Sequence, residues 1–277
     1  MTTRATRSQS IPLPLGRASL PPRSDVLWRW FAWWVRGYIQ KHFHAVRLSR
    51  GSRPRVPPDL PLIVVLNHPS WWDPLIGMIL AGLFPDRAHY APMDAQALTR
   101  YSLFHRLGFY GVEPGTPRGA FAFLRTTTAL LSQPGTAVWI TAQGQFADAR
   151  VRPPRLRSGI GHLARRLNQG VVVTLALEYP FWEERLPEAL ARFGEPIGIE
   201  RGQDLRAAGW VELIESNLAT TQDALMADAL SHDAAAFETL LTGKVAIGGI
   251  YDQGRKTWAW LRGERFQAEH GSGGGRP

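Results

Sequence analysis

The chain has 277 residues, which is long enough for one large domain with a substantial hydrophobic core. It contains no cysteine, so disulfides, thiolate metal sites and a cysteine nucleophile are excluded. The formal net charge of +9 is concentrated at one end: residues 1–60 hold 11 Lys and Arg against two Asp, whereas residues 61–277 hold 21 basic and 21 acidic residues. This asymmetry indicates a basic N-terminal arm on a neutral body.

The first predicted element is an amphipathic helix within residues 24–45. Its apolar side chains recur at spacings of three and four, and Ser24 suits the N-cap. Arg29, Arg36 and Lys41 interrupt the apolar run, whereas a membrane span needs about 20 consecutive apolar residues. Four tryptophans with flanking arginines are typical of a helix that lies at the headgroup boundary.

This helix predicts a peripheral protein on the cytoplasmic face of a membrane, with the anionic lipid surface as a partner. Two alternatives stay open. The helix could dock on the body of the protein, or the arm could bind nucleic acid. Because the basic residues are interleaved with much apolar bulk, we expect no nucleic-acid partner.

Beyond residue 60 the chain alternates strand-like and helix-like segments. Strands are expected at residues 62–66, 88–93, 109–113, 136–141 and 171–179, with an edge strand at 195–200. Helices are expected at residues 74–84, 96–109, 118–135 and 160–170, and residues 183–194 are expected to be partly helical. This alternation predicts an α/β fold with a mixed, largely parallel central sheet flanked by helices.

These elements suggest a division of the chain into five segments. Residues 51–60 are rich in proline and read as a linker, residues from about 203 are dominated by Ala, Leu and acids, and the C-terminus is rich in glycine. The expected segments are a disordered basic arm (1–23), the membrane-surface helix with its linker (24–60), the α/β core (61–202), a helical extension (203–265) and a flexible tail (266–277).

The turn after the first strand of the core carries the strongest chemical signal. His68 and Asp73 are five residues apart, which in a continuous helix would rotate them by about 140° from each other. Pro69 disfavours a helical conformation for His68, and Asp73-Pro74 suits the N-cap and first turn of a new helix. The carboxylate could then hold one imidazole nitrogen and leave the other as a base. The alternative is a histidine that is merely satisfied within the turn.

A second pair with the same spacing, His89 and Asp94, lies in the segment AHYAPMDA. It has no comparable strand-to-helix frame, and short motifs arise by chance. We therefore expect the first pair, not the second, to be functional. We expect no metal and no cofactor.

Four sequence blocks together resemble the glycerolipid (lysophosphatidic acid-type) acyltransferase family, which carries an HxxxxD signature. The block VVLNHPSWWDPL is similar to the first family block, and the likeness covers most of residues 62–200. The later blocks, in order, are RLGFYGVE, VWITAQGQF and VVVTLALEY, with LRSGIGHLA similar to the basic-residue-x-Gly segment after the third block.

The resemblance implies an O-acyltransferase. His68 would deprotonate a substrate hydroxyl, which attacks an acyl thioester of coenzyme A or acyl carrier protein, and Asp73 would orient His68. The acceptor would be a lysophospholipid-like or other lipid, and no covalent acyl-enzyme is required. A positioned base contributes about 10²–10⁴-fold, and placing the two substrates together supplies the rest.

The sequence departs from the family pattern where the family holds an acceptor phosphate. Gln143 stands in place of the usual glutamate of the third block, and the second block ends without its usual arginine. A neutral amide suits a sugar or polyol hydroxyl better than a phosphomonoester, yet nearby arginines could still bind phosphate. The acceptor therefore stays open, as do a catalytically weak lipid- or carrier-binding homologue and a thioester hydrolase. The expected substrate-binding residues are Asn67, Arg118, Gln143, Gly144, Arg150 and Arg157.

Overall fold

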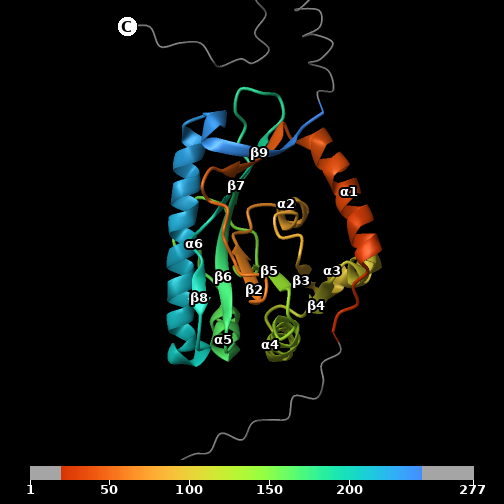
Figure 1. Cartoon of the computed structure of the whole chain (residues 1–277), viewed down its shortest axis with the longest axis vertical. Helices are drawn as coiled ribbons and strands as arrows, with labels where there is room; N and C mark the ends of the chain where they lie inside the picture. The colour runs from red at the N-terminus through yellow and green to blue at the C-terminus, as the bar shows by residue number, and fades with distance from the viewer. Residues whose placement is uncertain (1–19, 245–277) are drawn as a thin grey trace, which may run out of the picture.

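The computed structural model describes residues 20–244, which form an α/β fold around one mixed, mostly parallel sheet (Figure 1). The strand order is β4-β3-β5-β2-β6-β7-β1-β9, and β8 pairs with β6. The strands are β1 (Ala45–Ser49), β2 (Leu62–Leu66), β3 (Ala88–Asp94), β4 (Phe109–Val112), β5 (Thr136–Thr141), β6 (Gly170–Glu178), β7 (Glu188–Phe193), β8 (Ile197–Ile199) and β9 (Phe237–Thr242). The predicted fold class is confirmed.

Helices cover both faces of this sheet. They are α1 (Asp25–His42), α2 (Asp73–Ala81), α3 (Ala95–Arg100), α4 (Pro117–Leu131), α5 (Gly159–Arg166) and α6 (Ala207–Leu230), with 3-10 turns η1 (Ser102–Arg106), η2 (Gly202–Asp204) and η3 (Ala234–Ala236). In Figure 1, α6 and α1 stand at opposite sides of the molecule with α2 between them. The candidate site described below lies on the α1 and α2 side.

Strand β2 lies at the centre because every one of its side chains is apolar. Parallel strands buried on both faces read as continuous apolar runs, and LIVVL is buried throughout. Val64 packs with the cluster that includes α1 and α2, whereas Ile63 and Val65 pack with the cluster that includes α4, α5 and α6. The strand pairs in parallel with β5 and β6, so the carboxyl ends of these three strands meet at one edge of the sheet.

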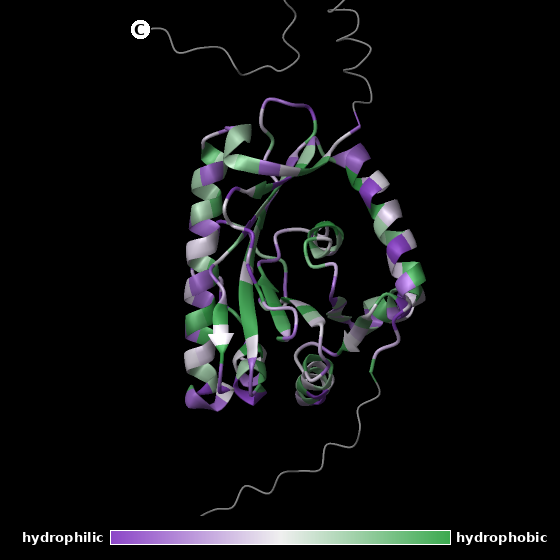
Figure 2. Ribbon diagram, viewed as in Figure 1, coloured by the Kyte–Doolittle hydropathy of each residue, from purple (hydrophilic) through white to green (hydrophobic). Residues whose placement is uncertain are grey.

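Helix α1 is present as predicted, with the Ser24 side chain accepting a hydrogen bond from the backbone N–H of Leu27. Its inner face is buried through Phe31, Val35 and Ile39, so the helix docks on the body. Its outer face exposes apolar and basic side chains together, and Figure 2 shows this alternation along the helix. Docking on the body and an exposed aromatic face are therefore both properties of α1.

Three segments differ from the sequence prediction. Residues 188–193 form β7 rather than part of a helix. Ala189, Leu190 and Ala191 are all fully buried, and consecutive buried residues are typical of a strand that is covered on both faces. Residues 237–242 form β9 rather than a helix, with Phe237 and Leu241 buried. The helix expected at 96–109 is split, with α3 ending at Arg100 and η1 following Tyr101.

The N-terminal segment also contains a strand, β1, which the sequence analysis did not predict. In β1, Arg47 forms an ion pair with the buried Glu188 of β7, so part of the N-terminal positive charge lies inside the sheet. The predicted helix after residue 203 is present as α6, but it packs on β6 and β7. The arm expected at 1–23, apart from its last four residues, lies outside the described residues. The tail expected at 266–277 and the end of the helical extension, 245–265, also lie outside them.

Candidate active site

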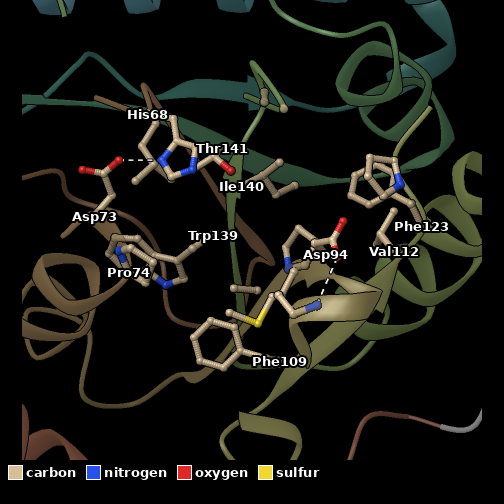
Figure 3. Close-up of a pocket in the computed structure, with 18 of the residues that line it drawn as sticks. His68, Asp73, Pro74, Asp94, Phe109, Val112, Phe123, Trp139, Ile140 and Thr141 are labelled. Carbon is tan, nitrogen blue, oxygen red and sulfur yellow. Dashed lines mark hydrogen bonds and ion pairs between the residues drawn. The ribbon is translucent and has the colours of Figure 1, made fainter. Parts of the chain in front are cut away.

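His68 and Asp73 meet at the edge where the central parallel strands end. Strand β2 stops at Leu66, His68 lies in the following turn, and Asp73 is the first residue of α2. The His68 Nδ1 atom lies 2.6 Å from Asp73 Oδ2 (Figure 3). The pairing expected from the Pro69 turn is therefore present, with one difference: Trp72 occupies the N-cap position, and the Asp73 carboxylate turns back to accept the backbone N–H of Ser70 at 3.1 Å.

The Asp73 carboxylate is fully buried and has a donor for each oxygen. Oδ2 accepts from His68 and from the Ser70 backbone, and Oδ1 accepts from the hydroxyl of Tyr179 at 2.6 Å. A buried carboxylate requires such partners, because an unpaired charge away from water is costly. The α2 N-terminus adds a favourable partial positive charge. These contacts fix the orientation of the carboxylate toward His68.

Tyr179 is a site residue that the sequence analysis did not identify. It follows the last residue of β6, which is paired with β2, so the topology brings its hydroxyl to the turn after β2. Burial, and then the Asp73 carboxylate beside it, raise the pKa of Tyr179 well above its ordinary value of 10. The phenol therefore stays protonated and donates. In the sequence, the position of Tyr179 at the end of the strand-like run VVVTLALEY is the feature that could have identified it as a site residue.

The His68 imidazole has one engaged and one accessible nitrogen. With Asp73 accepting from Nδ1–H, Nε2 carries the lone pair that can take a proton. The side chain is 17% exposed, and its ring lies on that of Phe146 with centroids 4.2 Å apart. His68 lines the pocket described next, so the basic nitrogen is accessible to a ligand there.

A large, mostly apolar pocket with a volume of about 1140 Å³ adjoins the His68–Asp73 pair (Figure 3). This volume slightly exceeds the usual range for small-molecule sites, about 300–1,000 Å³. Its walls come from helices on one side and strand ends on the other. Representative lining residues are Trp28 and Phe31 of α1, Met78 of α2, Phe109 of β4, Phe123 of α4 and Trp139 of β5. The pocket can hold a long apolar chain with its polar end near His68.

Gln143 supports the His68 turn from outside the pocket wall. Its Oε1 accepts the backbone N–H of His68 at 2.8 Å, and its Nε2 donates to the backbone carbonyl of Pro154 at 2.9 Å. The side chain is only 6% exposed. Both polar atoms are thus bonded to backbone, and the amide holds His68 against the 142–158 loop rather than facing a ligand.

Gly144 and Arg157 pack against each other in the pocket wall. Gly144 has φ of +66°, a conformation that favours glycine, and a Cβ atom there would overlap the Arg157 guanidinium. Arg157 donates to the carbonyls of Gln143 and Gly144, each at 3.3 Å. Among the described residues that line the pocket, Arg157 is the only Lys or Arg. Its charge is therefore the one placed to meet an anionic ligand group.

The other predicted substrate-binding residues lie outside the pocket lining. The Asn67 amide is buried and bonded to the backbone of Leu177 in β6. Arg150 is 78% exposed and pairs with Asp148, whose carboxyl pKa is held below its ordinary value by the hydrogen bonds from Arg150. Arg118 is exposed in the first turn of α4. Of the predicted residues, His68, Asp73, Gly144 and Arg157 line the pocket, and Gln143 contacts the His68 backbone from behind it.

The second His–Asp pair does not form. His89 Nε2 lies 3.1 Å from the Phe84 carbonyl, and His89 Nδ1 accepts from Trp139 Nε1 at 3.1 Å. Burial lowers the pKa of His89 to about 4, so the ring stays neutral. Asp94 instead caps α3 by accepting the backbone N–H groups of Gln96 and Ala97. The expected lack of a strand-to-helix frame was wrong, because β3 runs directly into α3 at Asp94, but both ring nitrogens of His89 are engaged by Phe84 and Trp139 rather than by Asp94.

Comparison with protein-family models and with curated proteins finds no match to this chain. Among residues 20–244, no group of three or more His, Cys, Asp or Glu side chains is arranged to hold a metal ion. No helix in that range is both long enough and apolar enough to cross a bilayer.

Proposed function

We propose that the protein is an O-acyltransferase that moves a fatty acyl group from a coenzyme A or acyl-carrier-protein thioester to a hydroxyl of a lipid acceptor. The observation that carries this proposal is the position of an Asp-held imidazole beside an apolar pocket of about 1140 Å³. A fatty acyl chain needs an apolar channel, and acyl transfer to a hydroxyl needs a base at its polar end. The similarity of the four sequence blocks to glycerolipid acyltransferases supports the same reaction.

In the proposed step, His68 acts as general base and Asp73 orients it. Nε2 takes the proton of the acceptor hydroxyl while the hydroxyl oxygen attacks the thioester carbonyl carbon. The C–S bond then breaks, and the leaving thiolate takes the proton from the imidazolium. The products are an ester and a free thiol, and His68 returns to its neutral form.

The acceptor is best argued from Arg157. Because both polar atoms of Gln143 are bonded to backbone, the loss of the family's glutamate does not by itself define a sugar or polyol acceptor. The Arg157 guanidinium lines the pocket and can bind a phosphate. We propose a lysophospholipid-like acceptor whose anionic headgroup contacts Arg157. Neutral glycolipid acceptors are the competing class, and comparing the two classes decides between them.

The exposed face of α1 supports peripheral attachment to an anionic membrane. Trp30 is 53% exposed and Trp33 is 71% exposed, and Arg29, Arg36 and Lys41 are exposed on the same helix. Tryptophan favours the headgroup boundary, and nearby basic residues favour anionic lipid.

The aromatic surface continues from α1 to the pocket. The Trp34 ring stacks on that of Tyr38, with centroids 5.1 Å apart, and the Tyr38 ring contacts that of Trp72 in a tilted arrangement at 5.9 Å. Trp71 stacks on Trp72, is 55% exposed and lines the pocket beside His68. A bilayer bound along this face would therefore lie next to the pocket, as a lipid acceptor requires.

The function is tested by incubating the full chain with radiolabelled palmitoyl-CoA and, in parallel, lysophosphatidate or a neutral glycolipid. We expect labelled lipid, and a loss of about 10²–10⁴-fold in His68→Ala. His162→Ala is the matched control, because His162 is exposed on α5 outside the pocket lining. Free fatty acid as the only product would indicate a thioester hydrolase. Binding of the thioester without either product would indicate a lipid-binding homologue.

A further inference from the structure

We infer that Tyr179 is a positioning residue that sets the basicity and orientation of His68 through Asp73; this inference rests on the proposed function of His68 as the base. The Tyr179 hydroxyl donates to Asp73 Oδ1 at 2.6 Å, and the opposite carboxylate oxygen meets His68 Nδ1 at 2.6 Å. The three groups form one chain of hydrogen bonds. Tyr179 does not line the pocket, so it acts through Asp73 rather than by touching substrate.

The framework around Tyr179 fixes its hydroxyl relative to the His68 turn. Asn67 precedes His68, and its amide bonds to both backbone polar atoms of Leu177, two residues before Tyr179. The Tyr179 ring also packs against Phe43, the C-cap residue of α1, with centroids 5.7 Å apart. The Tyr179 phenol is therefore positioned by the Asn67–Leu177 hydrogen bonds near its backbone and by the packing of its ring on Phe43. The short contact to Asp73 follows from this arrangement.

The direction of the effect follows from charge. The phenol draws electron density from the Asp73 carboxylate through Oδ1, which weakens the hold of Oδ2 on an imidazolium. Removing the hydroxyl concentrates charge at Oδ2, so Oδ2 becomes a stronger acceptor for the His68 Nδ1–H group. It also frees the carboxylate to rotate, which lowers the rate of proton transfer without altering the apolar pocket that binds the acyl chain.

Other ionisable groups near the pair are unchanged by this substitution and cannot produce the shift. The groups that line the pocket with His68 are His89, Tyr90, Asp94, Tyr101, Glu113 and Arg157. His42, near the end of α1, packs on Trp72, and the end of β6 also carries Glu178, with Asp148, Arg150 and Arg152 within electrostatic range of its carboxyl.

The test is Tyr179→Phe in the full chain, with Tyr110→Phe as the matched control. Tyr110 is likewise buried and its hydroxyl is hydrogen-bonded to Thr127 at 2.7 Å, but it lies in β4 outside the pocket lining. NMR of isotopically labelled histidine rings reports the His68 Nδ1–H group without any need for turnover. We expect Tyr179→Phe to move its proton resonance downfield, because Oδ2 becomes a stronger acceptor, and Tyr110→Phe to leave it unchanged.

Kinetics provide the second measurement. In Tyr179→Phe, the acidic limb of the kcat/KM profile should move to higher pH, and kcat should fall about 3- to 10-fold while the KM for palmitoyl-CoA stays unchanged. Incorporating 3,5-difluorotyrosine at position 179, which keeps the ring and strengthens the donor, should move the His68 Nδ1–H resonance upfield instead. An unshifted His68 resonance in both position-179 variants would overturn the inference. A shifted resonance in a protein without acyl transfer would retain Tyr179 as the positioning group and remove the proposed reaction.

Discussion

Gln143 Oε1 accepts the backbone N–H of His68 at 2.8 Å, across 75 residues of sequence. The same amide donates to the Pro154 carbonyl at 2.9 Å, so a glutamine is matched to one donor and one acceptor of the backbone. The residue that departs from the acyltransferase pattern thus lies directly behind the proposed base. The Gln143 side chain therefore acts on the position of His68 rather than on the binding of an acceptor.

Gln143→Glu should therefore lower the stability of the folded protein, although it restores the carboxylate of the acyltransferase pattern. A carboxylate can still accept from His68 but cannot donate to Pro154, and two oxygens would face each other in a buried site. We expect a loss of about 1–3 kcal/mol in the free energy of unfolding, measured by urea denaturation. Gln133→Glu, at an exposed position after α4, is the control and should leave stability unchanged. Equal stability of the two variants would contradict the role assigned to the Gln143 amide.

Asp73→Asn should remove activity while keeping the fold. The new amide would direct an N–H group either at His68 Nδ1, which forces the proton onto Nε2 and eliminates the base, or at the Tyr179 hydroxyl, which breaks the second contact. We expect kcat to fall by at least about 10²-fold, measured in the palmitoyl-CoA assay. Asp86→Asn, at an exposed site between α2 and β3, provides the comparison. Retention of more than a tenth of the activity in Asp73→Asn would remove Asp73 from its orienting role.

His89 should make stability fall in acid. Its folded pKa is about 4, against an ordinary value of 6.5, so the unfolded chain binds more protons between those two values. Stability is then highest above pH 6.5 and declines as the pH drops through this window, by roughly 3 kcal/mol at pH 4 from this group alone. Urea midpoints at pH 7 and pH 4.5 should differ more in the wild type than in His89→Gln. Parallel pH dependence in the two proteins would show that His89 is not responsible.

Replacing Trp30 and Trp33 by alanine should release the protein from anionic vesicles and leave the fold intact. Deletion of α1 would be a poor test, because Phe31, Val35 and Ile39 belong to the core. The two tryptophans are exposed, so their loss removes lipid contact alone. Vesicle co-sedimentation measures the effect, and binding of the wild type should weaken with added salt.

The control for the tryptophan variant is the pair Leu213→Ala and Leu230→Ala. Both leucines are exposed on α6, at the side of the molecule opposite α1. We expect this double variant to bind vesicles as the wild type does. Equal losses in the two double variants would show that exposed apolar area in general, rather than the α1 face, governs binding.

Local patterns predicted the parts of the fold whose sequence signals are local. The continuous apolar run of β2, the proline after His68 and the Ser24 cap each act within a few residues, and each prediction is confirmed. Strands β1, β7 and β9 were missed because their conformation depends on partners far along the chain. The Ala- and Leu-rich sequence of β7 is typical of a helix, and it forms a strand because β6 and β1 pair with its two edges.

The candidate site divides in the same way. His68 and Asp73 are joined by a turn of six residues, so their spacing could be interpreted directly. Tyr179 reaches Asp73 across 106 residues, and only the pairing of β6 with β2 brings them together. Asn67 and Gln143 are neighbours in sequence of residues that line the pocket. The sequence could not show that their own side-chain amides are hydrogen-bonded to backbone groups instead.

The pairing of β1 has a consequence for synthesis on the ribosome. Within the described chain, β1 finds its partners only in β7 and β9: Arg47 bonds to Glu188 across 141 residues and to Thr239 across 192. Contacts of such long sequence separation form late, because the intervening chain must be ordered first. Strand β1 is therefore made early and paired late, and until β9 emerges one of its edges stays unpaired. A nascent chain of this protein thus presents an open strand edge until its last strand is made, and during that interval the edge is accessible to a chaperone.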